Sequence, residues 1–169
     1  MLVGAAQRKD NRVVRGEGKV MVDVYLSLGS NMGDRAENIE NAISLLNIEL
    51  KTPYNAVSSL LETEPWGFES EQKFLNAAVH YQLQLKEGYN PEAEALMILE
   101  ICKDIERRLG RKEVLEYDEA GERIYHNRPI DIDILLFGEH RIDCPELTIP
   151  HKLMYERDFV MIPLKEIFS

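Results

Sequence analysis

The sequence predicts an α+β fold with a βαββαβ core, and three observations lead to this prediction. Residues 20–28 and 74–85 alternate apolar with polar side chains, the period of two that is typical of β-strands. Residues 35–50 and 91–109 repeat apolar side chains every three or four positions, as amphipathic helices do. Two further segments fit strands, and the resulting order of elements is that of the split βαβ, or ferredoxin-like, arrangement.

The first half of the chain is expected to form a strand, a helix and a second strand. The first strand, residues 20–28, ends in a turn at 29–34 that contains two glycines and side chains suited to cap a helix. The helix that follows extends to about Leu50, shortly before the helix-breaking Pro53. Residues 57–63 form the second predicted strand.

The second half begins with the third strand and a second helix. Asn90 and Pro91 are an N-cap followed by proline at the first helical position, and Gly110 lies at the C-terminal end of this helix. Residues 111–127 are charged and lack a sustained period. We interpret them as a long loop, which in compact domains is usually functional or disordered.

The last part of the chain completes the predicted sheet. Residues 128–137 are the fourth strand, a short strand lies near Ile142, and residues 148–168 hold short helical and irregular pieces. We expect a mainly antiparallel sheet with helices packed on one face and mobile catalytic loops on the other. Residues 1–19 show no period and are expected to be a disordered arm, so that residues 20–169 form a single domain.

Composition excludes several functional classes. The 169 residues include 20 Lys and Arg against 30 Asp and Glu, a net charge of −10. This balance gives no basic footprint for nucleic acid and no polybasic membrane anchor. No apolar run approaches the roughly 20 residues of a membrane span. Cys102 and Cys144 form no C-x-x-C motif, so we expect free thiols and a cytoplasmic location.

The strongest chemical signal is the pair Asp131 and Asp133 in the fourth strand. Residues two apart in a strand project from the same face, so the two carboxylates lie side by side while Ile132 and Ile134 face the core. Two adjacent carboxylates repel each other unless a cation lies between them, and oxygen ligands suit Mg²⁺. The alternative is an exposed strand face on which both carboxylates are solvated.

Cations and a histidine lie close to this pair in the sequence. Arg111 and Lys112 begin the long loop and Arg128 ends it, so the loop could close over a polyphosphate. An ordinary solvated loop remains the alternative. His151 and Arg157 form another polar cluster, although a single histidine is more often structural.

Aromatic residues indicate where a flat ring could bind. Trp66 and Phe68 stand beside a loop glycine, and Phe74 and Asn76 share one face of the third strand. An aromatic side chain can stack on a heterocycle while an amide reads its donors and acceptors. Core packing of Trp66 and Phe68, and simple exposure of Asn76, are the alternatives.

Several common nucleotide motifs are absent. The turn at 29–34 lacks the lysine of a Walker loop, and the sequence contains neither the protein-kinase motifs nor a nucleophile elbow. The residues alone therefore indicate a Mg²⁺-dependent enzyme that acts on a phosphate-bearing ligand beside a flat ring.

A family resemblance makes this interpretation more specific. The sequence contains, in order, the blocks YLSLGSNMGDR, ETEPWGF, FLNAAV, RRLGR and RPIDIDILLFG, closed by LTIPHKLMYERDFV. Through these blocks, residues 24 to about 167 resemble the 6-hydroxymethyl-7,8-dihydropterin pyrophosphokinase family of folate biosynthesis. Lys152 stands where the resemblance leads us to expect an aromatic residue, and Lys112 is the nearest match to a second loop arginine.

The resemblance implies a reaction and a set of site residues. The family transfers diphosphate from ATP to the pterin hydroxymethyl oxygen and releases AMP. By this resemblance Asp131 and Asp133 hold two Mg²⁺ ions, and Arg111 and Arg128 stabilise charge during the attack. The sequence shows no obvious strong base, so either Asp133 or metal-lowered acidity of the alcohol could serve for proton removal. The positions that match the ATP site are Glu106, Ile134, Leu147, Thr148, His151 and Arg157. The positions that match the pterin pocket are Thr63, Trp66, Phe74, Asn76 and Phe159.

Two other functions compete with this one. A non-catalytic ferredoxin-like binding module could have kept the fold, although the intact aspartate pair and Arg128 argue against it. An ATP-dependent kinase of another small alcohol would release ADP instead of AMP. We expect a monomer whose partners are its two small-molecule substrates, with no nucleic acid and no membrane among them.

Overall fold

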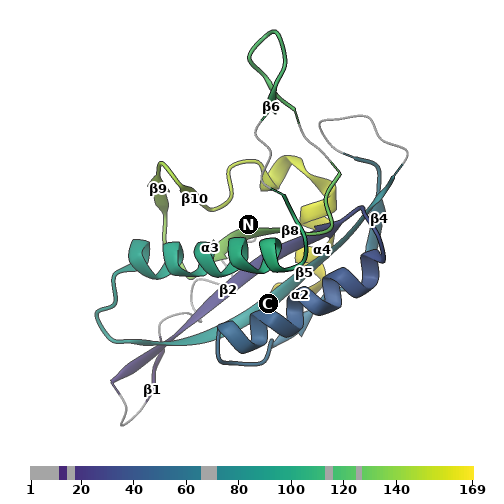
Figure 1. Ribbon diagram of the computed structural model, residues 1–169. Helices are drawn as coiled ribbons and strands as arrows, with labels where there is room; N and C mark the ends of the chain where they lie inside the picture. The colour runs from purple at the N-terminus through teal and green to yellow at the C-terminus, as the bar shows by residue number, and fades with distance from the viewer. Residues whose placement is uncertain (1–11, 15–17, 66–71, 113–115, 125–126) are drawn as a thin grey trace.

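The computed structural model describes residues 12–14, 18–65, 72–112, 116–124 and 127–169 (Figure 1). Its elements in chain order are β1 (Arg12–Val14), β2 (Lys19–Ser30), α2 (Arg35–Glu49), β3 (Ala56–Val57), β4 (Leu61–Thr63), β5 (Phe74–Lys86), α3 (Pro91–Arg108), β6 (Glu116–Tyr117), β7 (Arg123–Ile124), β8 (Asp131–Phe137), β9 (Ile142–Cys144), β10 (Leu147–Ile149), the 3₁₀ helix η2 (Met154–Glu156) and α4 (Asp158–Ile167). The predicted α+β class with a mainly antiparallel sheet is confirmed.

Two long strands form the centre of the sheet. β2 pairs with β5 in antiparallel register from Lys19↔Lys86 to Ser30↔Leu75. β8 pairs antiparallel with the other side of β2, while β3 and β4 pair with the outer side of β5. Every residue of β2 therefore has a partner on β5, and Val24 to Gly29 have a second partner on β8.

The first face of the sheet carries the larger core. Alternate residues of β2 point into this face, and α2 and α3 cover it (Figure 1). Its buried members from these three elements are Val20, Val22, Val24, Leu26, Leu28, Ile39, Ala42, Ile43, Leu46, Ala95, Ile98, Cys102 and Ile105. Burial of such side chains stabilises the fold by about 25 cal/mol per Å² of apolar surface removed from water.

Part of the second face of β2 is also buried, beneath α4 and η2. Tyr25, on this face, is only 2% exposed. It belongs to a second apolar cluster that α4 and η2 close. The other members of this cluster are Leu135, Leu136, Met154, Val160, Met161 and Leu164. The sequence did not reveal this layer because α4 is short and contains Pro163.

The predicted strand at 57–63 is divided into β3 and β4. The hydroxyl of Ser58 accepts a hydrogen bond from the backbone N–H of Ala78 at 2.8 Å. Ser59 then donates its backbone N–H and its hydroxyl to the carboxylate of Glu166 on α4, at 3.0 and 2.6 Å. These side-chain contacts interrupt the regular strand pairing with β5 and connect the linker between β3 and β4 to α4.

Four other segments differ from expectation. The loop at 111–127 contains the hairpin β6–β7, and β10 pairs with β9. Within the segment 1–19, β1 pairs with the start of β2, which corrects the expectation of an entirely disordered arm for these residues. β8 begins at Asp131 instead of Arg128, because the backbone of Arg128 is bonded to Asn31 and not to a neighbouring strand.

Two simpler features concern the chain as a whole. Among the described residues, no helix combines the length and the apolar character that a membrane span requires. Cys102 is buried and Cys144 partly buried, and both are free thiols.

Candidate active site

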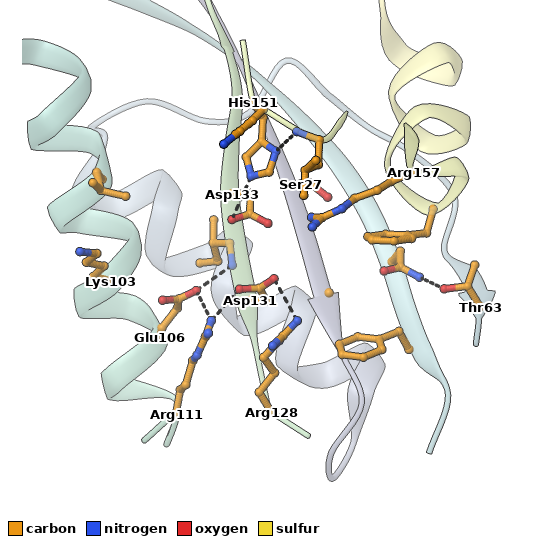
Figure 2. Close-up of a pocket in the computed structure, with 18 of the residues that line it drawn as sticks. Ser27, Thr63, Lys103, Glu106, Arg111, Arg128, Asp131, Asp133, His151 and Arg157 are labelled. Carbon is orange, nitrogen blue, oxygen red and sulfur yellow. Dashed lines mark hydrogen bonds and ion pairs between the residues drawn. The ribbon is translucent and has the colours of Figure 1, made fainter. Parts of the chain in front are cut away.

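A cavity of about 340 Å³ lies over the second face of the sheet (Figure 2). Its walls come from β2, β4, β5, β8, the C-terminal half of α3 and the segment from 151 to 159. The predicted site residues that line it are Thr63, Phe74, Asn76, Glu106, Arg111, Arg128, Asp131, Asp133, His151, Arg157 and Phe159. Segments that are far apart in the sequence thus meet at one place.

Asp131 and Asp133 form the polar centre of the cavity. On β8 they are paired with Gly29 and Ser27 of β2, which also line the cavity. Ile132, between them, is 4% exposed and packs in the core. The strand period therefore places both carboxylates on the same face, as the sequence predicts.

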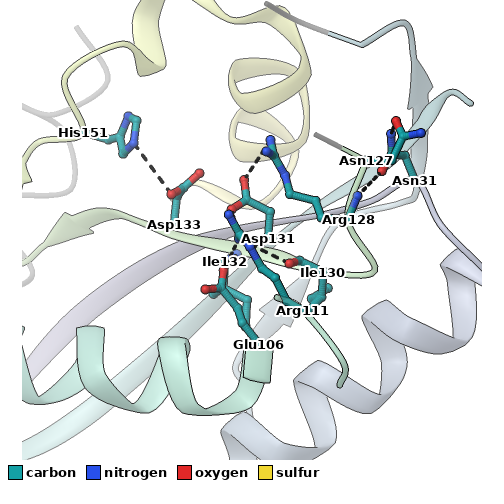
Figure 3. Close-up of polar contacts among 10 residues, drawn as sticks. All are labelled: Asn31, Glu106, Arg111, Asn127, Arg128, Ile130, Asp131, Ile132, Asp133 and His151. Carbon is teal, nitrogen blue, oxygen red and sulfur yellow. Dashed lines mark hydrogen bonds and ion pairs between the residues drawn. The ribbon is translucent and has the colours of Figure 1, made fainter. Parts of the chain in front are cut away.

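Arg111 joins two of the carboxylates of the site (Figure 3). Its Nη1 donates to Oε2 of Glu106 at 2.8 Å and to Oδ1 of Asp131 at 2.6 Å. The same oxygen of Glu106 accepts the backbone N–H of Ile132 at 2.8 Å. A second arginine, Arg128, approaches Oδ2 of Asp131 at 3.6 Å. Both oxygens of Asp131 therefore face a guanidinium group.

The three carboxylates of the site are not equally charged. Burial would raise the pKa of Asp131, but Arg128 and Arg111 outweigh burial and hold this pKa below its ordinary value. Burial, together with the charges of Asp131 and Glu106, raises the pKa of Asp133 to about 8. Burial and the charge of Asp131 raise the pKa of Glu106 to about 7. Asp131 is therefore the most readily ionised of the three.

These residues fit a bound magnesium ion. Nε2 of His151 lies 3.9 Å from Oδ1 of Asp133, and the charges of Arg157 and Arg128 also act on this carboxylate. Asp131 and Asp133 offer oxygen ligands, which Mg²⁺ prefers. The described part of the chain contains no group of three or more His, Cys, Asp or Glu side chains arranged around a metal position. The pair would therefore hold Mg²⁺ together with water or substrate oxygens, the usual pattern at nucleotide sites.

The other end of the cavity is apolar and holds a fixed amide. Nδ2 of Asn76 donates to Oγ1 of Thr63 at 2.7 Å and to the carbonyl of Leu61 at 3.1 Å. The amide oxygen lies on the side of Gly29, where an added Cβ would come within 3.3 Å of it. The absence of a side chain at position 29 keeps this part of the cavity open.

Two aromatic rings line the same end of the cavity, and each lies under an arginine. The guanidinium of Arg128 is 5.3 Å from the ring centre of Phe74, and that of Arg157 is 5.7 Å from the ring centre of Phe159. Such cation–π contacts fix the arginine side chains between the aromatic end and the carboxylate end.

Asn31 holds the entry to β8 against the end of β2. Its Oδ1 accepts the backbone N–H of Arg128 at 2.7 Å, and its own N–H donates to the carbonyl of Arg128 at 3.1 Å. Its Nδ2 donates to Oδ1 of Asn127 at 2.7 Å. Asn31 is 1% exposed, so this contact fixes the position of Arg128 from within the fold.

Comparisons with known proteins agree with this arrangement. The profile of the 7,8-dihydro-6-hydroxymethylpterin-pyrophosphokinase (HPPK) family matches residues 25–169. The chain belongs to the HPPK family. It is therefore an enzyme, a pyrophosphokinase of folate biosynthesis that acts on small molecules.

Individual relatives of this HPPK chain have similar lengths. It is 43% identical over 148 residues to a 2-amino-4-hydroxy-6-hydroxymethyldihydropteridine pyrophosphokinase of Porphyromonas gingivalis. The aligned residues cover 87% of this chain and 91% of the relative. The enzyme of the same name from Bacillus subtilis is 38% identical over 143 residues, 85% of this chain and 76% of the relative. Both proteins support the family assignment.

A solved structure shares the fold of the HPPK chain. It is a crystal structure of HPPK-DHPS in complex with substrates, with a TM-score of 0.56 and 14% sequence identity. The match covers 87% of this chain and 40% of that longer chain. At this identity the likeness concerns the fold alone.

Three of the described residues predicted for the HPPK site are not brought into the cavity. The side chain of Ile134 is 2% exposed and packs in the first-face core, because it alternates with Asp133 on β8. Leu147 and Thr148 lie on β10 and do not line the cavity, although His151 shortly after them does. Trp66 lies outside the described residues.

Other residues that line the cavity were not predicted as site residues. Leu99 and Lys103 stand seven and three positions before Glu106, a spacing that places all three on one face of α3. This helical period is the signal that could have identified them. Ser27 and Gly29 could similarly have been found as the strand partners of Asp133 and Asp131.

The raised pKa of Asp133 predicts that this residue destabilises the metal-free protein at high pH. Between about pH 4 and 8 the folded state holds a proton on Asp133 that the unfolded state releases, so stability falls as pH rises through this range. Asp133→Asn carries no such charge. With allowance for solvent screening, the free energy of unfolding of this variant at pH 8 should exceed that of wild type by about 1 kcal/mol or more.

Urea unfolding in EDTA at pH 5 and pH 8 measures this difference. The stabilisation by Asp133→Asn should be larger at pH 8 than at pH 5. Asp143→Asn, on the exposed side of β9, is the matched control and should show no such gain. Equal effects of Asp133→Asn at both pH values would contradict the prediction.

Proposed function

We propose that this enzyme transfers diphosphate from ATP to the hydroxymethyl oxygen of 6-hydroxymethyl-7,8-dihydropterin and releases AMP, with Mg²⁺ required. The observation that carries the proposal is the division of one cavity into two ends. Asp131 and Asp133, with arginines around them, stand at one end, and Asn76 with two aromatic residues stands at the other. A substrate that joins a flat ring to a reacting hydroxyl would span the two ends.

The carboxylate end would receive the nucleotide phosphates. Asp131 and Asp133 would hold the metal, two ions in our proposal, and bound Mg²⁺ supplies charge neutralisation for the phosphates. Arg111, Arg128 and Arg157 provide guanidinium groups that suit phosphate oxygens. Glu106 and His151 border the same end of the cavity. ATP therefore has counter-charges along its phosphate chain.

The aromatic end would receive the pterin. Since Nδ2 of Asn76 is already bonded to Thr63 and Leu61, its Oδ1 is the group left to accept N–H donors of the ring. Phe74 and Phe159 provide apolar faces for stacking. In this orientation the hydroxymethyl group extends toward Asp133.

The chemistry requires positioning and charge stabilisation more than covalent catalysis. Phosphoryl transfers depend mainly on alignment of the attacking oxygen and on neutralisation of developing charge. Arg111 and Arg128 are the residues that we assign to charge stabilisation. For removal of the hydroxyl proton we propose either Asp133 as the acceptor or the greater acidity that bound Mg²⁺ would give the alcohol.

Three further assignments belong to the same proposal. Residues 20–169 act as one pyrophosphokinase domain, and the enzyme works as a monomer because a single chain supplies both ends of the cavity. The free thiols of Cys102 and Cys144 are consistent with a reducing cytoplasm.

Identification of the nucleotide product tests the proposed reaction. With ATP, Mg²⁺ and the hydroxymethyl dihydropterin, the protein should form AMP. Formation of ADP would indicate a kinase of the ordinary type, and absence of turnover would indicate a binding module. Asp133→Ala should lower turnover by several orders of magnitude while circular dichroism shows an intact fold, and wild-type turnover in this variant would rule out its assigned role.

Nucleotide affinity should depend steeply on Mg²⁺. In our proposal Asp131 and Asp133 contact the phosphates through Mg²⁺, so the nucleotide loses this link when the metal is removed. Calorimetric titration of the protein with a non-hydrolysable ATP analogue, with Mg²⁺ and with EDTA, measures the effect. Tight binding in EDTA would contradict it.

The amide of Asn76 should determine pterin affinity. Asn76→Ala removes an acceptor and the contacts to β4, so KM for the pterin should rise by about 10- to 100-fold, the loss expected for one or two buried hydrogen bonds. KM for ATP should change little. The matched control is Asn55→Ala, at an exposed position before β3. An equal rise in both KM values would indicate general disruption instead.

A further inference from the structure

Arg111 is hydrogen-bonded to Asp131, a carboxylate that the proposed metal requires. Its Nη1 lies 2.6 Å from Oδ1 of Asp131, while Arg128 lies 3.6 Å from Oδ2 (Figures 2 and 3). A divalent cation needs at least one of these oxygens. In the described conformation, Arg111 therefore already neutralises an oxygen that a bound cation would use.

The position of Arg111 is fixed by three acceptors. The same Nη1 also donates to Oε2 of Glu106 at 2.8 Å and approaches the carbonyl of Ile130 at 3.4 Å. Glu106 is in turn held by the backbone N–H of Ile132. Glu106 thus connects Arg111 to the strand that carries Asp131.

Limited exposure makes these contacts strong. The side chains of Arg111, Glu106 and Asp131 are 19%, 12% and 25% exposed. At such exposure an ion pair is screened less than a surface pair. Arg111 follows directly after Gly110, whose φ of +95° turns the chain away from α3. This turn directs the arginine back toward β8.

We propose that Arg111 is a positioning residue that controls metal entry. Without nucleotide, its guanidinium group neutralises Asp131. When nucleotide binds, the guanidinium group contacts the phosphates instead. The metal therefore binds well together with nucleotide and poorly by itself. This inference rests on the proposed function, because it assigns the phosphate chain as the second partner of Arg111. Glu106 is the residue that holds Arg111 beside Asp131 before nucleotide binds.

A thermodynamic consequence follows from this arrangement. Metal and Arg111 compete for Asp131, and phosphates remove the competitor. Nucleotide must therefore raise metal affinity, and metal must raise nucleotide affinity by the same factor. Without the arginine, a part of this coupling disappears while binding of the metal alone improves.

Metal binding in the absence of nucleotide tests the proposal. Mn²⁺ as a probe of the Mg²⁺ site, measured by electron paramagnetic resonance of the free ion, should bind Arg111→Met about tenfold more tightly than wild type, within the usual range for coupled sites. The coupling between Mn²⁺ and a non-hydrolysable ATP analogue should fall by a similar factor. Turnover should also decrease, because Arg111 is assigned to charge stabilisation.

The chain offers a matched control for lost charge. Arg108 lies three residues earlier, bonded to Glu49 at 3.0 Å and Asp104 at 3.4 Å, and does not line the cavity. Arg108→Met removes the same charge but should leave Mn²⁺ affinity near that of wild type. Equal affinities of Arg111→Met, Arg108→Met and wild type for Mn²⁺ alone would overturn the proposal.

A measurement on the wild-type protein keeps the test independent of variant folding. ¹⁵N NMR of arginine side chains should show the Arg111 resonance move when Mg²⁺ and the ATP analogue are added together. A resonance that does not move would also overturn the proposal. If wild type forms no AMP but the Mn²⁺ results hold, the proposed reaction fails while the competition at Asp131 stands.

Discussion

The clustering of three carboxylates around one edge strand is the constraint on which the rest of the site depends. Asp131 and Asp133 share a strand face, and Glu106 approaches from α3. Such a cluster would be unstable without compensation, because buried like charges repel strongly. Arg111 and Arg128 compensate Asp131, a backbone N–H compensates Glu106, and protonation relieves Asp133. Each carboxylate of the cluster therefore depends on a different partner.

The scaffold converts this electrostatic cluster into a divided cavity. β2 is the central strand, and Gly29 stands on it between Asp131 on β8 and Asn76 on β5. Gly29 therefore lies between the two ends of the cavity, paired with Asp131 on one side and with Asn76 on the other. Asn31, at the end of the same strand, fixes Arg128 beside both ends. The backbone register thus determines which side chains can act on one bound molecule.

The sequence predicted those features that depend on local periods. The shared face of Asp131 and Asp133 follows from the period of two, and the order of helices and strands follows from apolar patterns. The motif resemblance identified most of the residues that line the cavity. The contact between Arg111 and Asp131 was not predictable, because it depends on how α3 ends relative to β8. Ile134 was assigned to the nucleotide site by resemblance, although its period places its side chain in the core. The burial of Tyr25 was missed because α4 is short and interrupted by proline.

The bond between Glu166 and Ser59 gives the last helix a role outside the cavity. Phe159 lies near the beginning of α4, while Glu166 near its other end grips the linker that precedes Thr63. α4 therefore acts as a rigid spacer between two walls of the ring pocket. A polar contact at a distance from the cavity thus helps to fix the position of one of its walls.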